Sequence, residues 1–128
     1  MVDLVSDVVN LIIGEELAEA VDVDIFKDFI PDAPNDVVVV SEYSGSDIHP
    51  FANASVRSIQ ILCRAKTPSK AREKCWKLFD MFTNKIPMTQ IGNHTCVLAL
   101  RNSPFKMEVD SKNRHLYVFN MGVTISFR

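Results

Sequence analysis

The sequence predicts a single α+β domain over residues 1–128, with a mostly antiparallel sheet of about four to five strands and two main helices packed on one side. Three patterns predict this class. Near the C-terminus, apolar and polar residues alternate with period two, as in a strand with one buried face. Residues 67–85 place apolar side chains at helical spacing. Earlier, a valine-rich segment, a long loop and a second alternating segment indicate an extended β-hairpin.

The first predicted element is a helix over residues 3–20, with several apolar stripes side by side. Asp3 or Ser6 can cap its start, and Gly14 weakens it or marks a bend or an early end. Residues 22–30 then form either a short strand or an irregular connector, because prolines follow closely.

The hairpin begins with residues 36–43, whose four consecutive valines indicate a strand covered on both faces near its start. Residues 44–54 are rich in turn-forming residues and are far longer than a hairpin turn needs. Residues 55–64 predict the returning strand, and its alternation turns three side chains toward the core: Ile59, Ile61 and Cys63.

The second helix, over residues 67–85, has clear start signals, since Thr67 can cap it and Pro68 occupies the first helical position. A loop containing Gly92 and Asn93 leads to a predicted strand over residues 94–102. The apolar face of the helix consists of Ala71, Cys75, Leu78, Phe79 and Phe82.

The last segment, residues 101–127, predicts an arm that can hold a short strand, a polar turn at residues 110–113 and one long strand that forms the spine of the sheet. We expect its core face to pack under the helices, chiefly against Phe79 and Phe82. That face consists of every second residue: Tyr117, Phe119, Met121, Val123, Ile125 and Phe127.

Charge is distributed unevenly along the chain. Residues 1–55 hold twelve acidic residues and one lysine, a net charge of −11, whereas residues 56–128 hold thirteen basic and four acidic residues, a net charge of +9. Two interpretations stay open. The domain has an acidic and a basic side suited to head-to-tail contact between copies, or the two halves neutralise each other inside the subunit.

The sequence holds no recognisable catalytic or metal-binding motif. The histidines His49, His94 and His115 lack metal-ligand spacing. The cysteines are an odd number among apolar residues, which predicts buried free thiols: Cys63, Cys75 and Cys96. No apolar run approaches the roughly 20 residues of a membrane span. We therefore expect no enzyme activity, no cofactor, no metal and no membrane association.

Two segments resemble the tail terminator (tail-completion) proteins of long-tailed bacteriophages, often labelled minor capsid proteins. Residues 55–82 have a strand with a short basic end, then a helix that closes in Leu-Phe-x-x-Phe. Residues 103–125 have a Ser-Pro arm, an acidic turn followed by a basic residue, and aromatic-x-aromatic-Asn before a β-branched run. The resemblance extends over residues 3–127 in element order, although residues 44–54 contain nothing diagnostic.

The resemblance implies a structural protein of the virion tail or neck, made in the host cytoplasm. It would form a homohexameric ring at the head-proximal end of the tail, end polymerisation of the tail tube, and join the head. Its implied partners are copies of itself, the tail tube protein and the head–tail connector or stopper protein. DNA would pass through the lumen without sequence-specific binding, and the acidic first half is our candidate for the lumen lining, since like charge avoids phosphate attraction.

Protruding loops on a rigid sheet commonly carry recognition. We therefore expect the long loop and the polar turn to contact the tube or connector through Ser44, Ser46, Asp47, His49, Phe51, Asp110, Lys112 and Arg114. Candidate residues for the subunit interface are Arg72, Trp76, Asp3 and Asp7. The alternative functions are another neck or head–tail adaptor component, or a small soluble binding module.

Overall fold

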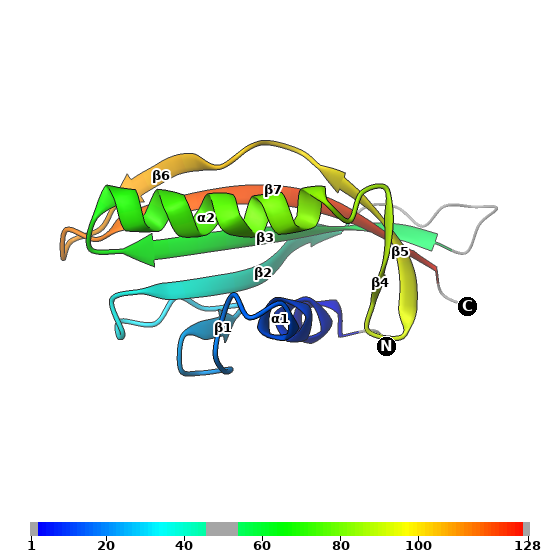
Figure 1. Cartoon of the computed structure of the whole chain (residues 1–128), viewed down its shortest axis with the longest axis horizontal. Coiled ribbons are helices and arrows are strands. Elements are labelled where there is room, and N and C mark those ends of the chain that lie inside the picture. The colour runs from blue at the N-terminus through cyan, green and yellow to red at the C-terminus, as the bar shows by residue number, and fades with distance from the viewer. Residues whose placement is uncertain (1–2, 46–53, 127–128) are drawn as a thin grey trace.

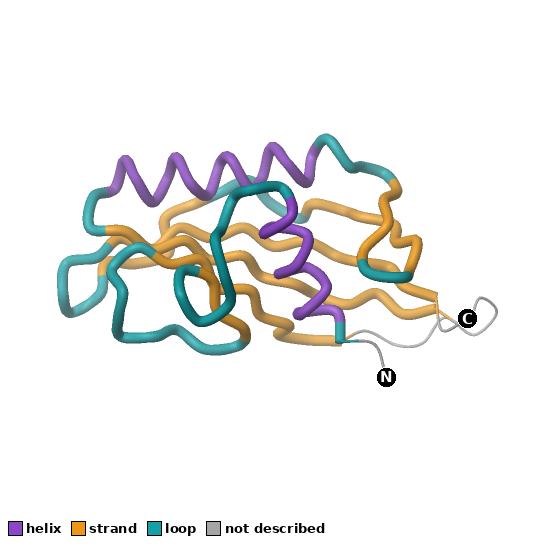
Figure 2. Tube along the Cα trace, turned by 60° about the horizontal axis from the view of Figure 1, so that its bottom comes forward, coloured by secondary structure: helices purple, strands orange, loops and turns teal. Residues whose placement is uncertain are grey.

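The computed structural model of this protein describes residues 3–45 and 54–126, which fold around one mixed sheet (Figure 1). Its strand order is β1-β2-β3-β7-β5-β4, and β6 also pairs with β7. Figure 2 shows that both helices lie on the same side of the strands. The elements in chain order are α1 (Leu4–Gly14), β1 (Ile25–Lys27), β2 (Val37–Gly45), β3 (Ala54–Ala65), α2 (Pro68–Thr83), β4 (Met88–Ile91), β5 (His94–Leu100), β6 (Phe105–Val109) and β7 (His115–Ser126).

β3 and β7 are the centre of the sheet. β7 pairs with β3 along its whole length, from Ala65 opposite His115 to Ala54 opposite Ser126. The other edge of β7 pairs with β6 near its start and with β5 near its end. The prediction that this strand is the spine is confirmed, as is the α+β class. The predicted four to five strands are too few, and the sheet is mixed because β1 runs parallel to β2.

Helix α1 begins where the sequence predicts and ends earlier. The Asp3 carboxylate accepts a hydrogen bond of 3.1 Å from the backbone N–H of Ser6, which caps the helix. The helix ends at Gly14, and Glu16 adopts a left-handed φ of 62° that a right-handed helix does not allow. Leu17 and Ala18 still pack against the core from irregular backbone. Their apolar spacing therefore extended the predicted helix too far.

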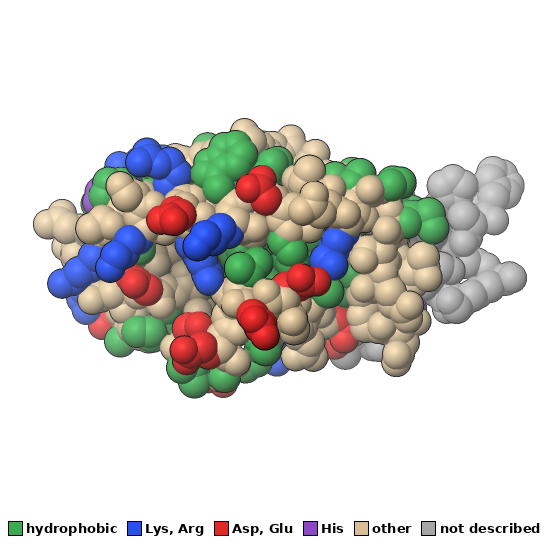
Figure 3. All heavy atoms as spheres, in the orientation of Figure 1, with side chains coloured by type: hydrophobic (Ala, Val, Ile, Leu, Met, Phe, Trp, Pro, Cys, Tyr) green, Lys and Arg blue, Asp and Glu red, His purple; other side chains and the backbone are tan. Residues whose placement is uncertain are grey.

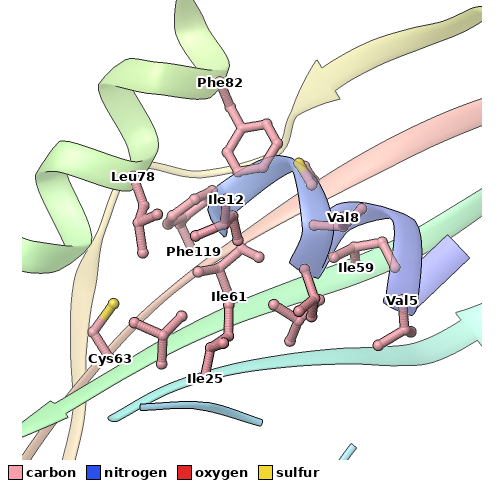
Figure 4. Packing of buried hydrophobic residues seen from close by; sticks show 14 of the residues in the cluster. Val5, Val8, Ile12, Ile25, Ile59, Ile61, Cys63, Leu78, Phe82 and Phe119 are labelled. Carbon is pink, nitrogen blue, oxygen red and sulfur yellow. The ribbon is translucent and has the colours of Figure 1, made fainter. Parts of the chain in front are cut away.

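The main core lies between the sheet and the two helices (Figure 4). Thr67 caps α2 by accepting a hydrogen bond from the backbone N–H of Lys70, and Pro68 stands at the first turn, as predicted. Phe119 is fully buried, with its ring centroid 5.4 Å from that of Phe79 and 6.2 Å from that of Phe82. The predicted packing of β7 under α2 is therefore confirmed.

A second, smaller core covers part of the opposite sheet face. It explains the valine run of β2, because Val38 and Val40 face the helices whereas Val37 and Val39 face this second core. The prediction that both faces of this strand are covered is therefore confirmed. The second core consists of Phe26, Val37, Val39, Leu62, Leu116 and Val118.

One further strand replaces a predicted loop, and a second lies in the arm, where the sequence leaves a strand open. Residues 88–91, expected to be loop, form β4 and pair with β5 across a tight turn in which Gly92 has a φ of 61°. The arm before the polar turn contains β6, which pairs with the start of β7. Both are short strands at the margin of the sheet with mostly exposed side chains, so neither has a strong burial pattern in the sequence.

Candidate functional site

The polar turn between β6 and β7 is held together by Asp110. Its carboxylate accepts hydrogen bonds from the backbone N–H groups of Lys112 (3.0 Å) and Arg114 (2.9 Å), and from Nε of Arg114 (2.8 Å). Asn113 adopts the left-handed conformation, with a φ of 58°. Burial alone would raise the pKa of Asp110, but the hydrogen bonds from Arg114 and Lys112 outweigh it and lower this pKa. The turn is thus a rigid structure.

Two buried arginines fix residues 31–35 over the end of the sheet next to this turn. The guanidinium of Arg64 donates hydrogen bonds to three backbone carbonyls, those of Pro31 (2.6 Å), Pro34 (2.6 Å) and Asn35 (3.1 Å). Arg114 donates to the carbonyl of Asp32. Since both side chains are 5% exposed or less, these bonds satisfy polar groups that burial would otherwise leave unpaired. We call Arg64, Arg114 and residues 31–35 the arginine clamp.

The clamp determines which predicted contact residues of the turn are accessible. Arg114 is buried and used within the subunit, and Asp110 is mostly covered. The side chain of Lys112 is 55% exposed and forms an ion pair of 2.7 Å with Asp32, which is 76% exposed. Of the three predicted contact residues of the turn, Lys112 is therefore the one that is exposed.

The long loop was the other predicted contact region. Ser44 lies in β2, where its backbone pairs with Ser58 of β3. Ser46, Asp47, His49 and Phe51 lie outside the described residues.

The four residues predicted for the subunit interface fall into two separate places. Asp3 caps α1, and its hydrogen bonds to Ser6 lower its pKa. Asp7 packs against the β4–β5 turn, so closely that a Cβ on Gly92 would stand 2.5 Å from Oδ2 of Asp7. On α2, Arg72 is exposed and Trp76 is 40% exposed, with its ring against Phe79 (5.3 Å between centroids).

Ion pairs join the acidic first half of the chain to the basic second half. They connect Lys85 to Glu15 (3.0 Å), Arg57 to Glu42 (Nε to Oε2, 2.6 Å), and Lys112 and Arg114 to Asp32. Internal neutralisation, one of the two interpretations of the charge pattern, therefore accounts for part of the imbalance.

A groove of about 330 Å³ lies between α2 and the start of β2. Figure 3 shows acidic and basic side chains interspersed on this face of the molecule. The groove mixes lysines with carboxylates, so it has no single sign of charge with which to hold a phosphate or a cation. Its charged lining residues are Asp24, Asp36, Arg64, Lys70, Glu73, Lys74 and Lys77.

Several apolar side chains at the margins of the sheet are exposed, which the sequence does not predict. On β6, Phe105, Met107 and Val109 are each exposed, and near β1 so are Phe29 and Ile30. The alternation of apolar residues with Lys106 and Glu108 was the available signal for β6. Where exposed apolar side chains form a contiguous patch, they mark surfaces for contact with other proteins, so these residues are candidates for such contact.

The described residues contain no group of three His, Cys, Asp or Glu side chains placed to hold a metal ion. The three cysteines are free and buried, as predicted, and burial raises the pKa of the Cys63 thiol. Within residues 3–45 and 54–126, no helix is long and apolar enough to cross a membrane.

An α+β subunit with a rigid turn, a clamped surface segment and apolar margins has the features of a protein that works by assembly with other proteins. The family model described as "Bacteriophage tail terminator protein" matches residues 12–127, and the chain belongs to this family. It is therefore a viral structural protein of the phage tail. No curated protein matches the chain.

Proposed function

We propose that this protein forms a homohexameric ring that caps the head-proximal end of the phage tail tube. The ring ends polymerisation of the tube protein and offers the surface to which the head connector or stopper protein joins. The observation that carries the proposal is the family match, which extends over residues 12–127 and so includes all strands and α2.

The architecture supports a ring for a physical reason. A closed ring of identical subunits uses a heterologous contact, in which two different surfaces of the subunit meet. The apolar margins at β1 and at β6 are two such surfaces, on opposite edges of the sheet. Arg72 and Trp76 remain our candidates for subunit contact. Asp3 and Asp7 have the internal roles described above, so they would contribute chiefly by positioning α1.

Contact with the tube and connector is assigned to the two loop regions. Lys112 is the exposed one of the three predicted contact residues in the turn, and the residues Ser44, Ser46, Asp47, His49 and Phe51 belong to the long loop. We assign the lumen to surfaces of the acidic first half, so that passing DNA meets like charge and no sequence-specific site. A lumen lined by Lys70 and Lys74 instead would contradict this assignment.

The decisive experiment is negative-stain imaging of tails assembled without this protein. Abnormally long tubes are the expected result, because nothing then stops polymerisation. Tails of normal length that fail to join heads would refute the terminator function and indicate a neck adaptor instead. Adding the purified protein back should restore normal tail length, and a Lys112→Glu variant tests the part that the rigid turn plays in joining.

A further inference from the structure

The strand β6 has a free outer edge. Among the described residues it pairs with β7 alone, and all five of its residues are exposed. Phe105, Met107 and Val109 have exposed fractions of 46%, 39% and 42%. Exposed apolar edge strands promote unwanted pairing, and proteins usually protect them with charge, bulges or a covering segment. The irregular register between Lys106 and Glu108 is one such bulge, but it leaves the apolar side chains uncovered.

Trp76 of α2 belongs to the same margin. Residues 70, 73, 74 and 77 of α2 line the groove toward β2. At 100° per residue, Arg72 and Trp76 lie on the other flank of the helix. Figure 1 shows β6 beside α2 on the side away from β2. Lys106 and Val109 pair with Tyr117 and His115, so they lie on the sheet face that carries α2, whereas Phe105 and Glu108 pair with Val118 and Leu116 and lie on the other face. We give the name β6 margin to this edge of the molecule, which consists of β6 with Arg72 and Trp76 of α2.

The opposite edge of the sheet carries a second apolar surface. Val23, Phe29 and Ile30, which flank β1, are 52%, 55% and 49% exposed. The ring of Phe29 packs edge-on against Phe26, with 5.5 Å between centroids, which fixes its orientation. Exposed acidic side chains, Asp22 and Asp28, stand beside these residues. We call this surface the β1 margin.

We propose that the β1 margin of one subunit docks on the β6 margin of a second copy of this chain. Both surfaces present three or more apolar side chains, and the acids of the β1 margin complement Arg72 and Lys106 of the β6 margin. Because the margins are different surfaces on opposite edges of one sheet, each subunit keeps one free margin after pairing. The contact is therefore heterologous and can continue from subunit to subunit. This inference rests on the proposed ring and names its interface.

The test uses two aspartate variants, one for each margin, with sedimentation or native mass measurement of the purified proteins. Met107→Asp buries a carboxylate at the β6 margin, and Phe29→Asp does the same at the β1 margin. Each variant alone should have the mass of a monomer, 14.4 kDa, at concentrations where the wild type forms a larger ring. Met88→Asp is the matched control, because Met88 is 57% exposed on β4 and lies in neither margin, so it should assemble as the wild type does.

Mixing the two monomeric variants gives the sharpest outcome. Each retains the margin that the other lacks, so an equimolar mixture should form a 1:1 dimer, twice the 14.4 kDa of one chain, and nothing larger. A mixture that stays monomeric would show that the two margins do not meet. Thermal unfolding checks that the variants fold, and Phe105→Asp replaces Met107→Asp if the latter does not.

The remaining outcomes separate this inference from the proposed function. Variants that still form wild-type rings would overturn the assigned interface and leave the ring intact. A wild type that stays monomeric at all concentrations and never joins tubes would overturn the ring and this interface together.

Discussion

Replacing Phe119 with alanine removes the side chain at the centre of the main core. Phe119 is fully buried, and its ring meets Phe79 edge-on and Phe82 at a tilt. Deleting a buried phenylalanine costs about 3–5 kcal/mol, because apolar contact is lost and a cavity remains. Each aromatic pair adds about 0.5–1.5 kcal/mol beyond its buried area. We therefore expect the free energy of unfolding to fall by an amount near the upper end of the range of about 3–5 kcal/mol. That is a large share of the free energy of unfolding of a typical protein, about 5–15 kcal/mol.

Urea unfolding followed by circular dichroism measures this loss. The urea concentration at the midpoint of unfolding should fall, whereas the dependence of the unfolding free energy on urea concentration should stay the same. An unchanged dependence shows that the variant has lost stability and that the compactness of its folded and unfolded states is unaltered. Protein concentration is held fixed, because subunit association adds to apparent stability. Met88→Ala, at a mostly exposed position, is the control and should change stability by no more than about 0.5 kcal/mol. A loss below about 1.5 kcal/mol for Phe119→Ala would refute the assigned packing.

Three further predictions concern the clamp and the turns. Arg64→Leu leaves three backbone carbonyls without their buried donor, so the free energy of unfolding in urea should fall by about 3 kcal/mol. Amide hydrogen exchange of residues near the clamp should become faster, and unchanged exchange there would contradict the clamp. Gly92→Ala should destabilise the folded protein by about 1–3 kcal/mol, because Gly92 has a positive φ and the Asp7 carboxylate lies next to it. Gly14→Ala is the comparison: the space around Gly14 is open, so this change should be neutral or stabilising. Equal effects of the two changes would refute this prediction. Because the folded-state pKa of Asp110 is lowered, its stabilisation is present above the unfolded pKa of about 3.9 and is lost as pH falls through the folded value. Asp110→Asn should therefore unfold with a weaker dependence on acid pH than the wild type, and an identical profile would contradict the prediction.

The parts of the fold that the sequence predicts well have a strong local pattern. The alternation of β7 and the capped, amphipathic α2 are signals within one segment, and the structure confirms both. Helix α1 was predicted too long, because Leu17 and Ala18 are held in the core by tertiary contacts and not by helical backbone. β4 was not predicted and β6 was left open as a strand of the arm, because short strands at the sheet margin are defined by their neighbours more than by their own composition.

The interaction surfaces were harder to predict than the fold. Arg64 and Arg114 are far apart in the sequence from each other and from residues 31–35. The sequence therefore gives no sign that both arginines donate hydrogen bonds to the backbone carbonyls of that segment. Arg114 was expected on the surface for this reason. Trp76 was named as a candidate for the subunit interface, but which strand lies beside its flank of α2 depends on the sheet order. Long-range pairing of this kind has no signature in a single sequence.

The central position of β7 has a consequence for synthesis. β7 is the last of the described strands, yet it pairs with β3, β5 and β6, and β6 pairs with no other described strand. While the ribosome is still making the preceding residues, these three strands lack their common partner, and Phe79 and Phe82 lack the Phe119 ring. A chain cut before residue 114 would also lack the Asp110-to-Arg114 contacts that close the turn. An unfinished chain therefore lacks the strand that holds β6, and with it the proposed β6 margin, in place.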